Sequence, residues 1–255
     1  MIDTSYVIAF KTGIERGPFK KHDKCIFNIN NNQLFIDAFY QAYLDAARTF
    51  RGIGNSETKS QVFEAYALKV QCYFKNQDKN FDEWHEEWCD GFIKDLTVYP
   101  TKYGQAQKIL NMMLKYLYCC DGAEKFESIY KCAHMPLDTF TLNWFKREVL
   151  KGSYHKNQCG YEIKEWSNLD KATYIYIKDK IKNHLGANAS PLATEFIIWP
   201  DETLITLTNA LTEFAKGYLK CGYPIHENDT LSEEIIKAEH SLKSLKASFR
   251  KTTPV

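Results

Sequence analysis

The sequence lacks the features that would place the protein in a membrane or in a secretory pathway. It has no apolar run of about eighteen residues, the length that a membrane-spanning helix requires. Its first residues, MIDTSYVIAFKTG, show neither the basic region nor the small-residue cleavage site of a signal peptide. The sequence therefore predicts a cytoplasmic protein with no membrane partner.

Several catalytic signatures are also missing. The chain contains no Walker loop, no dinucleotide-binding fingerprint, no HExxH pair and no GxSxG elbow. These absences argue against nucleotide-dependent enzymes, zinc proteases and serine hydrolases. No cofactor is implied by any motif in the sequence.

Cysteine is present, but not in a metal-binding pattern. The chain has eight cysteines and no CxxC pair. Because it is long and several cysteines fall on apolar stripes of expected helices, we expect reduced thiols. Cys119, Cys120, Cys132 and His134 could be grouped into a zinc site, but adjacent cysteines rarely ligate one tetrahedral ion. No metal site is predicted.

The charges are nearly balanced, with 33 lysines and arginines against 32 acidic residues and a net charge of +1. A neutral total predicts no strong general attraction to nucleic acid, although local patches can differ from the total. Of the 255 residues, 44% are hydrophobic and 15% aromatic, which is enough to fill a sizeable core.

The spacing of apolar residues predicts an all-α protein with two helical lobes and a minor N-terminal β element. Short apolar runs at Tyr6 to Phe10 and Cys25 to Asn28 are consistent with two strands or a packed arm. We expect a single mostly helical domain, in which residues 30–98 with the C-terminal helices form one lobe and residues 99–200 the other.

Two expectations concern the C-terminal part of the chain. Pro200 should break the chain before a helix over Leu204 to Leu219, because proline lacks a backbone donor and clashes with the preceding turn. Leu231 to Lys251 has few apolar residues and many charges, which indicates a surface helix or a partner-binding helix.

The most regular helical pattern runs from Lys102 to Cys120. Its apolar residues recur at three- and four-residue spacing, which places them on one buried face. A second stripe carries three lysines and no acidic residue: Lys102, Gln105, Lys108, Asn111 and Lys115. This stripe either faces solvent, the commoner case because lysine is rarely buried, or faces an anionic group such as Asp138.

Asp138 and His134 also have structural explanations. Asp138 precedes a helical pattern that includes Phe140, so it is well placed to be the N-cap of that helix. His134 stands beside Met135 and Pro136, and it is more simply a hydrogen-bonded structural histidine than a catalytic base.

An acidic helix is expected over residues 80–95. Its carboxylates could bind a metal, but without an ordered loop of oxygen ligands such a cluster is more often a solvated surface. This face and the charged C-terminal helix would suit a protein partner, so the chain can also be interpreted as a non-enzymatic helical interaction module. The acidic residues are Asp82, Glu83, Glu86, Glu87 and Asp90.

Three elements follow one another in an order that recurs in a known superfamily. A helix bearing Gln107 and Lys108 is followed about thirty residues later by Met135-Pro136-Leu137-Asp138, and then by Glu195 to Trp199. This order resembles the helix-hairpin-helix DNA glycosylase superfamily and is most similar to the archaeal 8-oxoguanine DNA glycosylase branch. The resemblance covers roughly residues 99–200 and implies an all-helical fold with a damaged base bound between two subdomains.

Carried over to this chain, the resemblance implies a DNA-repair function with DNA as the partner. Lys108 would be the amine nucleophile, Asp138 would assist it, and Lys115 would be the competing nucleophile. A partly buried lysine near a helix N-terminus has a lowered pKa, which makes it nucleophilic. The residues expected to contact the substrate are Gln105, Gln107, Asn111, His134 and Trp199.

Overall fold

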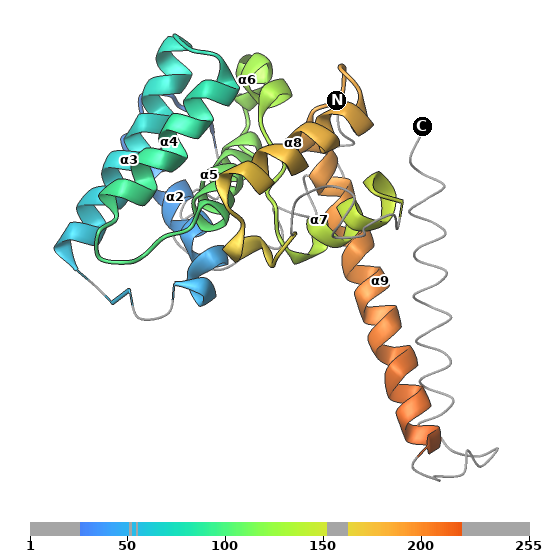
Figure 1. The fold of residues 1–255 in the computed structure, drawn as a ribbon. Coiled ribbons are helices and arrows are strands. Elements are labelled where there is room, and N and C mark those ends of the chain that lie inside the picture. Colours follow the sequence, from blue (N-terminus) through green and yellow to red (C-terminus); the bar gives the residue numbers. More distant parts are fainter. Residues whose placement is uncertain (1–25, 51–52, 55, 152–162, 221–255) are drawn as a thin grey trace. The chain divides into compact units, whose positions relative to one another are not determined.

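The computed structural model describes residues 26–50, 53–54, 56–151 and 163–220, with side chains described through residue 207 and at residues 209 and 210. These residues form an all-α fold (Figure 1), as the apolar spacing predicts. The chain divides into two compact units, Met1–Ile197 and Ile198–Val255. None of the described helices is long and apolar enough to cross a membrane.

The described part of the first unit is built from helices alone. In chain order they are α2 (Asn32–Ala46), η2 (Ala47–Thr49), α3 (Glu57–Asn76), α4 (Phe81–Asp95), α5 (Tyr103–Tyr118), η3 (Ala123–Phe126), α6 (Glu127–Cys132), α7 (Thr139–Trp144), the π-helix η4 (Phe145–Val149), η5 (Trp166–Asn168) and α8 (Lys171–Leu185). Helix α9 (Pro191–Lys220) begins in this unit and continues into the second.

Helix α5 is the centre of the first unit. It packs against α2, α4, α8 and η5 (Figure 1), and every residue from Tyr103 to Leu117 is buried. The predicted apolar face is therefore buried, and so is the polar stripe except for the exposed Lys102. The expectation that this stripe most simply faces solvent is wrong, because carboxylates from other elements meet its lysines.

A glycine allows α5 to approach its neighbour closely. The Gly104 backbone N–H donates to the Leu169 carbonyl at 3.0 Å. A Cβ atom added at Gly104 would lie 1.8 Å from the Trp166 carbonyl oxygen, so no other residue fits here without movement of the backbone of η5. The N-terminal turn of α5 is thereby packed directly against η5.

Polar side chains begin the helices, as their positions before the apolar stripes predict. The clearest case is Asp138, whose carboxylate accepts the Thr141 backbone N–H at 3.0 Å and caps α7. Asn31, Ser56, Asn80 and Asp170 cap α2, α3, α4 and α8 in the same way. Each such cap contributes about 1 kcal/mol of stability.

The expected N-terminal β element is only partly within the described residues, since Tyr6 to Phe10 lies outside them. Ile26 forms an isolated parallel bridge with Asp121, and no strand follows it among the described residues. The Phe27 ring instead packs against the rings of Phe35 and Phe74. From residue 26 this segment is a packed arm, because the half-buried ring of Phe27 lies against helices and not against a second strand.

Two further expectations are wrong. Pro200 does not interrupt the chain, because α9 continues through it; proline removes one hydrogen bond of the helix, and the turns on either side continue regularly. Cys120 is disulfide-bonded, whereas Cys72, Cys89 and Cys132 are free thiols. Sequence spacing could not show which cysteines meet. The expected helix from Leu231 to Lys251 lies outside the described residues.

Candidate functional site

The structure brings Lys108 and Asp138 together. Lys108 Nζ donates to Asp138 Oδ2 at 2.9 Å, and the two residues are 5% and 8% exposed. The other carboxylate oxygen, Oδ1, is held by the Thr141 backbone N–H. The two explanations of Asp138 from the sequence, as helix cap and as lysine partner, therefore apply together, one to each oxygen.

The surroundings keep Asp138 ionised. Burial raises its pKa, but the charge of Lys108, the Thr141 backbone N–H and the charge of Lys115 together outweigh burial, so the pKa lies below its usual value. At neutral pH Asp138 is therefore a carboxylate, and its Oδ2 accepts a hydrogen bond from Lys108. Such a group can accept a proton from an amine.

A second lysine of the same stripe forms an ion pair of its own. Lys115, about two turns further along α5, contacts Glu195 in the first turns of α9. The side chains of this pair are only 3% and 1% exposed. Burial raises the pKa of Glu195, and the positive charge of Lys115 opposes that rise. The pair therefore fixes the start of α9 to α5.

The charges of Lys108 and Lys115 also act on Asp45 of α2. It is an exposed residue, and its carboxylate accepts the Tyr116 hydroxyl at 2.7 Å. Burial of the carboxyl raises its pKa above the usual value, while the Tyr116 hydrogen bond and the charges of Lys108 and Lys115 oppose that rise. Nothing in the sequence distinguishes Asp45 from the other polar residues of α2, which include Asp37 and Gln41.

Gln107 holds the segment that carries Asp138. Its Nε2 donates to the Leu137 carbonyl at 3.0 Å, and its Oε1 accepts the Leu137 backbone N–H at 3.2 Å. The fully buried amide of Gln107 thus makes the same two hydrogen bonds to the Leu137 backbone that a neighbouring β-strand would make. Gln107 thereby positions the carboxylate opposite Lys108.

The other amides of the stripe also have internal partners. Gln105 Nε2 donates to the Thr49 carbonyl at 2.9 Å, and its Oε1 accepts the Lys102 backbone N–H. Asn111 Nδ2 donates to Gln107 Oε1 at 3.0 Å. The substrate-binding role expected for Gln105, Gln107 and Asn111 stays a prediction, and the structure uses their amides to hold the site together.

His134 lies in a hydrogen-bonded chain. Its Nε2 is 2.7 Å from Asp82 Oδ1, and its Nδ1 is 2.8 Å from the Tyr174 hydroxyl. Because a carboxylate only accepts, Nε2 carries the proton and the neutral ring accepts from Tyr174 at Nδ1. Burial lowers the pKa of His134 although Asp82 opposes this. His134 is therefore a neutral, hydrogen-bonded histidine at pH 7.

The chain of hydrogen bonds continues into the core. The Tyr174 hydroxyl accepts from Asn111 Nδ2 at 3.2 Å, and Asn111 Oδ1 lies 3.0 Å from His85 Nε2. Burial lowers the pKa of His85 well below its usual value. Asn111 thus links the histidine chain to Gln107 and so to the segment before Asp138. This link between distant helices has no signature in the sequence.

The acidic face of α4 is partly occupied by α8. Lys178 Nζ lies 3.0 Å from Asp82, and Lys171 Nζ lies 3.1 Å from Glu86 and 2.7 Å from Asp90. These carboxylates therefore connect two helices of the same unit. Within the part of the chain that the structure describes, no group of three His, Cys, Asp or Glu residues could hold a metal ion.

Trp199 is the one candidate that belongs to the second unit, and it is 39% exposed. Its expected contact with a substrate stays a prediction. No protein-family model, no curated protein and no solved structure matches the chain. The chemical capacity of the molecule is therefore judged from the geometry of its own residues.

Proposed function

We propose that the protein is DNA-glycosylase-like and acts on, or binds, damaged or unpaired bases in DNA. The observation that carries this proposal is the buried contact of 2.9 Å between Lys108 Nζ and Asp138 Oδ2. It supports the resemblance to the helix-hairpin-helix DNA glycosylases, in which a lysine on a helix is followed by an aspartate after a proline-containing turn. Lys108 is the proposed nucleophile and Asp138 its proton acceptor.

The proposed reaction uses the amine and the carboxylate in turn. Asp138 first takes one proton from the Lys108 ammonium, and the nitrogen lone pair then forms a bond to C1′ of the deoxyribose while the bond from C1′ to the base nitrogen breaks. The base leaves with that electron pair and takes the proton from Asp138, which then accepts a second proton from the alkylated nitrogen. Asp138 passes this proton to the ring oxygen as the ring opens, which gives a protonated Schiff base that water hydrolyses.

The surroundings of the two lysines favour Lys108 over Lys115 as the nucleophile. The Asp138 side chain is 12% exposed, whereas that of Glu195 is 1% exposed. Asp138 also has one oxygen held by its helix cap, so only the other oxygen is available to take a proton. A substrate atom could approach Lys108 with less rearrangement than it could approach Lys115.

Borohydride trapping tests the proposal. Wild-type protein is incubated with oligonucleotides that contain 8-oxoguanine, uracil or an abasic site, and the Schiff base is reduced to a stable adduct. The test variant is Lys108→Met combined with Asp138→Asn, which removes both charges together and avoids leaving one charge buried alone. The matched control is Lys115→Met combined with Glu195→Gln, an equally neutral replacement on the same helix.

We expect an adduct with wild-type protein and with the control, and none with the Lys108 variant. An adduct that persists in the Lys108 variant would contradict the assigned nucleophile. No adduct on any substrate, together with no salt-sensitive DNA binding, would contradict the whole proposal. That result would favour the non-enzymatic helical interaction module, the alternative that the charged segments of the sequence suggest.

A further inference from the structure

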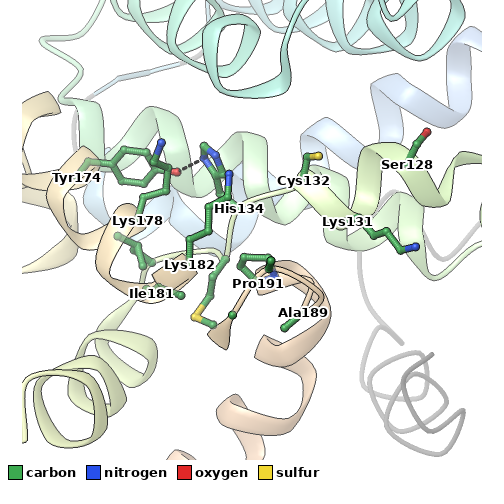
Figure 2. A pocket seen from close by; sticks show the side chains of 14 residues that line it. Ser128, Lys131, Cys132, His134, Tyr174, Lys178, Ile181, Lys182, Ala189 and Pro191 are labelled. Carbon is green, nitrogen blue, oxygen red and sulfur yellow. Dashed lines mark hydrogen bonds between the residues drawn. The ribbon is translucent and has the colours of Figure 1, made fainter. Parts of the chain in front are cut away.

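A cavity of about 310 Å³ opens beside His134 in the first unit. It is formed by the end of α6, the segment after it, α8 and the start of α9 (Figure 2). Its apolar lining includes Met135, Ile181 and Pro191. The volume falls in the range of small-molecule sites, and neither Lys108 nor Asp138 lines the cavity.

The charged part of the lining is basic. Lys131, Lys178 and Lys182 line the cavity, and none of its described lining residues is acidic. Lys178 already contacts Asp82 and Asp179, both at 3.0 Å. Lys182 is less constrained, because its Nζ lies 3.9 Å from Asp82 and its side chain is 59% exposed. A ligand carboxylate can therefore meet Lys182 without displacing a short ion pair.

The polar atoms of the two aromatic lining residues, His134 and Tyr174, are bonded to other residues of the protein. One ring nitrogen of His134 is bonded to Asp82. The other is bonded to the Tyr174 hydroxyl (Figure 2). What remains toward a ligand is the apolar surface of these rings and of the neighbouring aliphatic side chains. Apolar walls with a basic rim are complementary to an apolar molecule that carries a negative charge.

We propose that this cavity binds a small organic carboxylate with a flat or branched apolar body of about ten to fifteen non-hydrogen atoms. The apolar body lies against Met135, Ile181 and Pro191, and the carboxylate contacts Lys182. This site is separate from the proposed DNA chemistry, and nothing in that proposal requires it.

Two exposed cysteines allow ligand binding in the cavity to be measured by alkylation. Cys132 is an exposed free thiol that lines the cavity. Cys72 is an exposed free thiol on α3 that does not line it. A ligand in the cavity should therefore slow the alkylation of Cys132 and leave that of Cys72 unchanged, which peptide mapping by mass spectrometry can measure separately.

Three probes of the same shape test the chemistry of the ligand: 1-naphthoate, the neutral 1-naphthalenemethanol and the cationic 1-naphthylmethylamine. Calorimetry and alkylation of the full chain should show 1-naphthoate binding with a dissociation constant below about 1 mM. We expect the alcohol to bind at least about tenfold more weakly and the amine not to bind, because only the anion gains from the basic rim. Only 1-naphthoate should protect Cys132 at equal concentration.

Two lysine variants on α8 locate the contact. Lys182→Gln should weaken 1-naphthoate binding by about three- to fivefold, since it removes the ammonium at the rim. Lys180→Gln changes an exposed lysine of the same helix that does not line the cavity, and its affinity should stay within about twofold of wild type. Both substitutions are at exposed positions, so neither should prevent folding.

The proposal is overturned if 1-naphthoate does not bind, if it binds without protecting Cys132, or if the alcohol binds equally well. Equal effects of Lys182→Gln and Lys180→Gln would overturn the assigned contact. The double variant at Lys108 and Asp138 should bind 1-naphthoate as wild type does. Loss of DNA trapping and loss of carboxylate binding can therefore be observed separately.

Discussion

Helix α5 carries two buried ion pairs of the same kind, and they differ in how they are enclosed. Lys115 and Glu195 have side chains that are 3% and 1% exposed, and they join the centre of the unit to α9. Lys108 and Asp138 have side chains that are 6% and 12% exposed, and one oxygen of Asp138 is fixed by its helix cap. The comparison teaches that two ion pairs on one helix can differ in how far they are enclosed, and that the Lys108–Asp138 pair is the less enclosed of the two.

The largest effect is expected from separating the more enclosed pair. Lys115→Met leaves Glu195 charged and buried without its ammonium, so it should lower the free energy of unfolding by about 3–5 kcal/mol. Adding Glu195→Gln should recover most of that loss, because both charges are then gone. Urea unfolding of the four proteins in this double-mutant cycle measures the coupling. Additive effects would show that the two side chains do not act as a pair.

The same cycle at the less enclosed pair should give a smaller loss. Lys108→Met should lower the free energy of unfolding by about 2–4 kcal/mol, since Asp138 keeps its cap and has more access to water. Asp138→Asn in the same chain should recover part of it. If this cycle gave a larger coupling than the Lys115 cycle, the ranking of the two sites by enclosure would be wrong.

Replacing Gln107 should disturb the Lys108–Asp138 pair and leave the Lys115–Glu195 pair unchanged. Gln107→Met removes the partners of the Leu137 backbone N–H and carbonyl, so it should lower the free energy of unfolding by about 1–3 kcal/mol. It should also reduce borohydride trapping, because Asp138 loses its positioning. Gln61→Met replaces an exposed glutamine on α3 and serves as the control. Trapping that is unchanged in Gln107→Met would contradict the positioning role.

The two buried histidines should make the stability of the protein depend on pH between about 7.5 and 5.5. Burial lowers the pKa values of His85 and His134 in the folded protein, while in the unfolded chain histidines titrate near about 6.5. Below about pH 6.5 the unfolded chain binds more protons than the folded one. The free energy of unfolding is therefore highest above that pH and falls as the pH drops below it.

For each histidine the slope is at most about 1.4 kcal/mol per pH unit. Urea unfolding at pH 7.5, 6.5 and 5.5 measures the slope, and His134→Asn should reduce it. A free energy of unfolding that stays constant between pH 7.5 and 5.5 would contradict the account of two buried neutral histidines.

Local patterns predicted the elements and part of the site. The apolar spacing from Lys102 to Cys120 marked the central helix, and polar residues before apolar stripes marked the helix starts. The two lysines and Asp138 could be named because one stripe held positive charges without acidic neighbours. These patterns do not show which side chains meet in the folded protein. Lys115 meets Glu195, and His134 meets Asp82 and Tyr174.

The failed expectations have the same origin. The polar stripe was expected most simply at the surface because lysine is rarely buried, and it is buried because carboxylates from α7 and α9 reach it. The break at Pro200 followed from the local rule for proline, yet α9 continues through that residue. The disulfide at Cys120 depends on chain proximity, which spacing along the sequence does not encode.

The most direct measurement is the position of the reduced adduct in the wild-type protein. After borohydride trapping on an abasic oligonucleotide, proteolysis and mass spectrometry identify the lysine that carries the sugar remnant. We expect the remnant on Lys108, whose partner Asp138 is the less enclosed of the two carboxylates. A remnant on Lys115, or on exposed lysines without preference, would contradict this assignment.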